Sequence, residues 1–250
     1  MLITKNVTKK FGGLTAIDDV SLKIDEGIIT VIIGPNGAGK TTFFNVISGV
    51  YTPTEGKVYF EGNEIQNLKP YQVNKIGISR TYQIINLFKN MSVLENVMVG
   101  MQSRLNSNFF MSLFHTRKER AEEKAALESA YNWLEFVGLQ EKMLNPAGSL
   151  SYGEQRLLEI VRGLSSNPKL ILLDEPAAGM NIQEKIELDV LLQEIVRRGV
   201  SILMVEHDMK LVMDVADKIF VLNNGSLLAE GTPKEIQSNP LVIEAYLGGE

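Results

Sequence analysis

The chain has 250 residues, of which 44% are hydrophobic, so it is long enough to bury a sizeable core, and its formal net charge is -5. Its longest apolar runs fall well short of the roughly 18 to 20 residues of a membrane-spanning helix, and the acidic balance disfavours a nonspecific nucleic-acid surface, so we expect no nucleic-acid partner. The start lacks a signal-peptide core and the chain has no cysteine, which favours a cytoplasmic location.

The predicted elements change character along the chain. Short strands and glycine turns are expected in the first 65 residues: "LITKNVTKKF", "DDVSLKID", "GIITVIIG" and "KVYFEGNEI". Helical patterns dominate from about 92 to 165. Strands then alternate with helices: "KLILLDE", a helix with Leu188, Leu191, Leu192 and Ile195 on one face, "SILMVEH", a short helix, and "KIFVLNNG". This alternation indicates a mainly parallel α/β core interrupted by a helical subdomain.

A glycine-rich segment, "GPNGAGKTT", lies between a predicted strand and a predicted helix and fits the pattern G-x-x-x-x-G-K-[ST]. Its backbone N–H groups and the helix N-terminus can surround phosphate oxygens. Lys40 would reach the β and γ phosphates and Thr41 would ligate Mg²⁺, although a glycine-rich turn with an incidental lysine is the alternative. The predicted nucleotide-binding residues here are Gly34, Pro35, Asn36, Gly37, Ala38, Gly39, Lys40, Thr41 and Thr42.

Two carboxylates close the later strand "LILLDE". In open α/β sheets, ligands bind at the carboxyl ends of the strands. Asp174 would hold Mg²⁺, and Glu175 could orient and polarise an attacking water. By itself such a pair is as often a solvated turn or a helix cap, but after a phosphate-binding loop it favours nucleotide hydrolysis.

Four segments together carry a resemblance to a known family. "GPNGAGKTT", "LSYGEQ", "LLDEP" and "MVEHD" occur in the order and approximate spacing of an ABC transporter ATP-binding subunit. The resemblance covers essentially the whole chain. It implies a single ABC ATPase domain over 1–250: a P-loop NTPase core with an N-terminal antiparallel β subdomain (1–84 and 166–250) and an inserted helical subdomain (85–165).

The resemblance also implies roles for single residues. Phe11 resembles the aromatic that stacks on adenine, although alone it could be a core residue. Gln83 resembles the glutamine that reaches Mg²⁺ and the attacking water and senses the membrane partner, although it could be a loop amide. His207 resembles the histidine that contacts the γ-phosphate, although it could merely start a helix.

The segment "LSYGEQ" has two compatible interpretations. Ser151 and Glu154 have the spacing of a helix capping box. The spare Ser151 hydroxyl proton, the Gly153 N–H and the helix N-terminus could also bind an anion. The resemblance implies two cassettes head to tail, with each ATP between one phosphate loop and the other chain's "LSYGEQ", so Ser151, Gly153 and Glu154 are predicted nucleotide-binding residues.

Two positions depart from the broad superfamily pattern: Tyr152 stands where glycine is usual, and Asn181 where aspartate is usual. Both resemble the subgroup that energises uptake of branched-chain amino acids, as do "AAGMN", "RTYQIINLFKNMSVLENVMVG" and the ending "EAYLGG". That subgroup implies a peripheral subunit at the cytoplasmic face of the inner (plasma) membrane. Its partners would be a second ATPase subunit, identical or not, membrane permease subunits and, indirectly, a periplasmic binding protein.

Other functions stay open at this point. A cassette for urea uptake or lipid export would share the same motifs, and a soluble ABC ATPase without a transporter is a further alternative. The aromatic segment 104–120 could pack under the helical subdomain or contact the permease, with Phe109 and Phe110 as the residues that would decide between the two.

Overall fold

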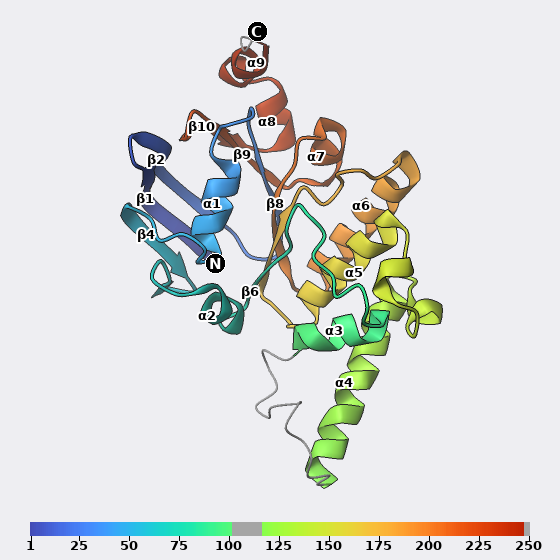
Figure 1. The fold of residues 1–250 in the computed structure, drawn as a ribbon. Helices are drawn as coiled ribbons and strands as arrows, with labels where there is room; N and C mark the ends of the chain where they lie inside the picture. The colour runs from blue at the N-terminus through green and yellow to red at the C-terminus, as the bar shows by residue number, and fades with distance from the viewer. Residues whose placement is uncertain (102–116, 248–250) are drawn as a thin grey trace.

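The computed structural model describes residues 1–101 and 117–247 (Figure 1). The hypothesis about Phe109 and Phe110 lies outside these residues. Within them, no helix combines the length and the apolar character that crossing a membrane requires.

The smaller of two sheets is entirely antiparallel, which confirms the predicted N-terminal β subdomain. Its strands are β1 (Leu2–Phe11), β2 (Leu14–Ile24), β4 (Glu55–Phe60) and β5 (Asn63–Glu64), in the order β2-β1-β4-β5. In β2, Val20, Leu22 and Ile24 are buried while Ser21 and Lys23 between them are exposed. This period of two is expected where one face of a sheet covers a core.

The larger sheet is parallel except at one edge. Its strands are β3 (Ile29–Ile33), β6 (Ile78–Arg80), β7 (Leu170–Asp174), β8 (Ser201–Val205), β9 (Lys218–Asn223) and β10 (Ser226–Gly231), in the order β10-β9-β3-β8-β7-β6. Only β10 runs antiparallel to its neighbour. Every residue of β3, β7 and β8 is buried, as in a sheet covered on both faces. Because these three strands are neighbours, the loops at their carboxyl ends meet at one edge.

Helices cover both faces of the larger sheet. Helix α1 (Lys40–Ile47) lies between the two sheets, and its Phe43 and Phe44 join their shared core (Figure 1). On the opposite face, α6 (Ile182–Arg197) and α7 (Met209–Val215) pack against β3 and β8. The remaining helices of this part are α2 (Pro70–Lys75), α8 (Pro233–Gln237) and α9 (Pro240–Leu247).

Between β6 and β7 the described chain forms a loop and then a series of helices. It contains α3 (Val93–Met101), α4 (Arg117–Phe136), the short 3-10 turns η2 (Gln140–Lys142) and η3 (Ala147–Ser149), and α5 (Tyr152–Leu164). Helix α5 joins two cores, since Leu158 packs with α3 and α4 while Ile160 packs beneath the sheet. Figure 1 shows α4 projecting away from both sheets. Helix α5 therefore connects the packing of α3 and α4 to that of the sheet.

Candidate functional site

The glycine-rich loop is held tightly between neighbouring backbones. Gly34 has φ 154°, and a Cβ there would collide with the Leu222 carbonyl oxygen. Gly39 has φ 98°, and a Cβ there would lie 2.5 Å from the Ala16 carbonyl oxygen. No other residue fits either position, so the two adjoining strands fix the path of this loop.

Lys40 lies across its own loop. Its Nζ donates to the carbonyl oxygens of Gly34 (2.6 Å) and Pro35 (3.0 Å). Burial lowers the pKa of Lys40, while the nearby carboxylates of Glu175 and Asp174 oppose that shift. The first turn of α1 has no side-chain cap. A cation and free N–H groups therefore face the same loop, as phosphate binding requires.

Asp174, at the end of β7, is held by an arginine that sequence reasoning missed. Arg80 Nη2 donates to Asp174 Oδ2 at 3.0 Å, and Arg80 Nη1 donates to Asn45 Oδ1 (2.8 Å) and Ser48 Oγ (2.7 Å) on α1. Burial raises the pKa of Asp174, and Arg80 counteracts this rise by favouring the ionised carboxylate. Asp174 Oδ1 accepts no hydrogen bond from the described residues, which leaves it available to a cation.

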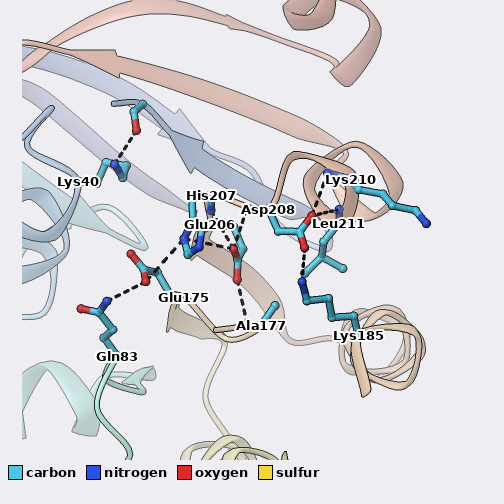
Figure 2. Close-up of polar contacts among 11 residues, drawn as sticks. Lys40, Gln83, Glu175, Ala177, Lys185, Glu206, His207, Asp208, Lys210 and Leu211 are labelled. Carbon is cyan, nitrogen blue, oxygen red and sulfur yellow. Dashed lines mark hydrogen bonds and ion pairs between the residues drawn. The ribbon is translucent and has the colours of Figure 1, made fainter. Parts of the chain in front are cut away.

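Glu175 lies where two other predicted residues converge (Figure 2). Gln83 Nε2 donates to Glu175 Oε2 at 2.8 Å, and His207 Nδ1 lies 3.7 Å from the same oxygen. Glu175 has φ 48°, a left-handed conformation that is uncommon outside glycine, and its N–H donates to the Val205 carbonyl at 2.9 Å. Such strained backbone clusters at functional sites. The structure thus brings together the three residues that were predicted to be catalytic.

The Gln83 loop is fastened to α5 by a second arginine that sequence reasoning missed. The fully buried Arg156 donates to the carbonyl oxygens of Tyr82 (2.8 Å) and Gln83 (2.7 Å) and pairs with Glu159 at 3.0 Å. The sequence offers one signal for this contact. On an amphipathic helix, an arginine and a glutamate three residues apart on the core-facing side indicate a buried ion pair. Their partners could not be inferred, because they lie more than 70 residues away in the sequence.

The predicted capping box of "LSYGEQ" is confirmed. Ser151 Oγ accepts the Glu154 N–H at 3.3 Å, and Glu154 Oε2 accepts the Ser151 N–H at 3.0 Å. The other oxygen of Glu154 pairs with Lys142, which holds the pKa of Glu154 below its ordinary value. Both Glu154 oxygens are therefore engaged inside the chain, whereas Ser151 keeps a hydroxyl proton to donate.

Tyr152 and Asn181, the two departures from the superfamily pattern, fit their local structure. Tyr152 begins α5 with an ordinary negative φ, so this position does not require glycine. Its ring covers Gly179, where a Cβ would lie 2.9 Å from Tyr152 Cε1. Asn181 caps α6 by accepting the Glu184 N–H at 3.0 Å, which an amide oxygen does as well as a carboxylate.

Two predicted nucleotide contacts lie apart from the Glu175 cluster. Phe11 is 41% exposed, unlike a core residue, and its ring meets the Tyr51 ring edge to face at 5.2 Å. Lys9 Nζ lies 5.0 Å from the Phe11 ring centroid. Within the described chain, no hydrogen bond or ion pair joins the "LSYGEQ" segment to the glycine-rich loop. One chain alone does not bring these two motifs into contact.

Family models match two parts of the chain. Residues 17–178 match the ABC transporter family, and residues 226–250 match a family described as branched-chain amino acid ATP-binding cassette transporter. The first match covers the glycine-rich loop, "LSYGEQ" and the carboxylate pair.

Curated relatives match over nearly their full length. The chain is 46% identical to the high-affinity branched-chain amino acid transport ATP-binding protein BraF of Pseudomonas aeruginosa. It is 43% identical to LivG of Escherichia coli K12, which carries the same description. Each alignment covers 99% of this chain and 98% of the relative.

Solved structures of ATP-binding cassettes share the fold. A nucleotide-free cassette from an ABC transporter is 36% identical with a TM-score of 0.86, covering 100% of this chain and 99% of that one. A cassette in its ADP conformation is 37% identical with the same TM-score and coverage. A more distant cassette, 28% identical with a TM-score of 0.78 over 93% of this chain and 99% of that one, is a dimer bound to ADP and phosphate. The chain therefore belongs to the ABC transporter family of ATP-binding cassettes.

Proposed function

We propose that the chain is the ATP-hydrolysing subunit of an ABC importer for branched-chain amino acids. The observation that carries the catalytic part is the convergence of Gln83 and His207 on one oxygen of Glu175, next to the phosphate loop. The substrate class is supported by the 43–46% identity to BraF and LivG and by the family match of the C-terminal segment.

In the proposed reaction, residues of the glycine-rich loop bind the ATP phosphates and Lys40 leaves its own loop carbonyls to reach the β and γ phosphates. The exposed Phe11 ring stacks on adenine. Glu175 orients a water molecule and accepts its proton, while Gln83 positions that water and His207 donates to the γ-phosphate. The remaining proposed loop contacts come from Gly34, Pro35, Asn36, Gly37, Ala38, Gly39, Thr41 and Thr42.

The donor set fits Mg²⁺. Thr41 offers a hydroxyl, Asp174 an unengaged carboxylate oxygen, and Gln83 its amide oxygen, because its Nε2 is used on Glu175. Mg²⁺ is usually coordinated by oxygen ligands from one or two protein residues, together with phosphate oxygens and water. In the described residues no cluster of three His, Cys, Asp or Glu offers an all-protein metal cage. When bound, Mg²⁺ would neutralise charge on the β and γ phosphates.

The proposed assembly contains two cassettes. Ser151 and Gly153 of one chain would bind the γ-phosphate held by the other chain's loop, and Glu154 would support them by fixing the Ser151 backbone. A helical subdomain, proposed as 85–165, would pass the nucleotide state from Gln83 through Arg156 to permease subunits. The complex would lie at the cytoplasmic face of the inner membrane and act with a periplasmic binding protein.

Reconstituted transport tests this proposal. The cassette is co-purified with its permease and second ATPase subunit and placed in proteoliposomes with the cognate binding protein. We expect ATP-driven uptake of radiolabelled leucine, isoleucine and valine, with the Glu175→Gln complex as the inactive control. Urea uptake, lipid export, or ATP hydrolysis by a chain that never associates with a permease would each reject the importer assignment.

A further inference from the structure

A buried carboxylate lies at the turn between β8 and α7. Glu206 precedes His207, and its side chain is 1% exposed. Glu206 Oε2 accepts the N–H groups of His207 (2.8 Å) and Asp208 (3.1 Å), whereas Oε1 accepts the N–H of Ala177 at 2.9 Å (Figure 2). Three backbone donors from two separate turns therefore meet on one side chain.

The two turns are those that carry the proposed chemistry. Ala177 comes two residues after Glu175 in the turn that follows β7, and His207 belongs to the turn that follows β8. A second link between them is the hydrogen bond from the Glu175 N–H to the Val205 carbonyl. A carboxylate this deeply buried is stable only when its oxygens are well satisfied, so this arrangement is a specific bridge and not a chance contact.

Glu206 acts on the backbone and not on the imidazole. Its Oε2 lies 3.9 Å from His207 Nδ1, beyond hydrogen-bond distance, while it bonds the His207 N–H directly. The neighbouring Asp208 points the other way: it caps α7 and pairs with Lys185 of α6 at 2.6 Å (Figure 2). Of the two carboxylates beside His207, only Glu206 reaches the Glu175 turn.

We propose that Glu206 is a positioning residue that sets the spacing between His207 and Glu175 during ATP hydrolysis. The proposal rests on the functions proposed above for those two residues. Glu206 touches no phosphate itself; it fixes the backbone from which each side chain projects. The 3.7 Å between His207 Nδ1 and Glu175 Oε2 is then maintained by the bridge.

The first test replaces Glu206 by glutamine. An amide can accept through its oxygen only, so its NH₂ group must face one of the backbone donors and one turn is released. A displacement of about 1 Å at a reacting centre costs on the order of 100-fold in rate, so we expect kcat to fall roughly 10- to 100-fold. The Kd for ATP should change less than about twofold, because Glu206 touches none of the loop residues.

A matched control is Asp217→Asn. Asp217 Oδ2 accepts the Ile29 N–H at 2.8 Å, at the other end of β3 from the glycine-rich loop. The same chemical change there should leave kcat unaltered. If Glu206→Gln impairs folding, Glu206→Asp keeps the charge but is one methylene too short to join both turns, and it should show the same loss of kcat.

A double-mutant cycle separates positioning from a general structural effect. Because Glu206 positions His207 relative to Glu175, the Glu206→Gln loss of kcat should be clearly smaller in a His207→Ala background than in the wild-type chain. If the two losses multiply in full in the Glu206→Gln/His207→Ala double variant, the proposal is overturned. The chain has two histidines, so in a His115→Gln background the single remaining imidazole NMR signal reports on His207. It should shift in Glu206→Gln and stay in place in Asp217→Asn.

Two sets of outcomes separate the role of Glu206 from the proposed catalytic site. Full activity of Glu206→Gln, beside inactive Glu175→Gln and His207→Ala, would overturn the role of Glu206 and leave the proposed function intact. Full activity of Glu175→Gln and His207→Ala would reject the proposed catalytic site itself.

Discussion

At the scale of single residues, the adjacent carboxylates Asp174 and Glu175 lie in different surroundings. Asp174 is buried and its Oδ2 is fixed by Arg80, whereas the side chain of Glu175 is 23% exposed and accepts a hydrogen bond from the neutral amide of Gln83. A carboxylate fixed by a guanidinium suits a metal ligand, and a more accessible one suits a proton acceptor. Position along the chain places the two acids together, but their surroundings assign them different tasks.

Glu175→Gln should abolish turnover and leave ATP binding intact. The amide keeps the size of the side chain but cannot accept a proton from water, so phosphate release should fall at least about 100-fold. Steady-state phosphate release and equilibrium binding of a fluorescent ATP analogue measure the two effects. Glu187→Gln makes the same change at an exposed position of α6 and should behave as wild type. Undiminished phosphate release by Glu175→Gln would contradict the assignment.

At the scale of elements, continuous apolar runs predicted β3, β7 and β8 correctly because both faces of these strands are buried. The three-residue β6 was missed, since so short a run carries no periodicity. The glycine-rich loop and the carboxylate pair were predictable, because phosphate and water chemistry restricts their residue types and spacing. Gln83 and His207 were predicted only through the family resemblance. Arg80 was not predictable, since its partner Asp174 lies 94 residues further along the chain and is brought to it only by the sheet order.

The start of helix α5 can be tested by substituting its N-cap residue, Ser151. Ser151→Ala removes the acceptor for the Glu154 N–H and should lower the free energy of unfolding by about 1 kcal/mol. Ser151→Thr keeps the hydroxyl and should recover most of this loss. Ser149→Ala is the control, because that exposed hydroxyl donates to the Pro146 carbonyl and caps no α-helix. Denaturant unfolding of the three variants measures the differences, and equal stability of Ser151→Ala and wild type would contradict the cap.

At the scale of the whole molecule, one chain carries two proposed half-sites that do not meet. The glycine-rich loop binds its own lysine, and "LSYGEQ" presents the Ser151 hydroxyl, with its proton left to donate, on an exposed helix start. A dimeric cassette with ADP and phosphate has the same fold. Each half-site is completed if two chains pair head to tail, so nucleotide binding and association become one equilibrium.

ATP should therefore drive dimerisation of a chain that cannot hydrolyse it. Glu175→Gln with saturating ATP should elute with the mass of two chains in gel filtration with light scattering, and should revert to one chain when ATP is removed. Adding Ser151→Ala should weaken this dimer, since the hydroxyl proposed to bind the γ-phosphate held by the partner is lost, while Ser149→Ala should not. If the physiological pair is a heterodimer, the dimer will form only after the partner ATPase subunit is added. A monomer under both conditions would show that the two half-sites do not share a nucleotide.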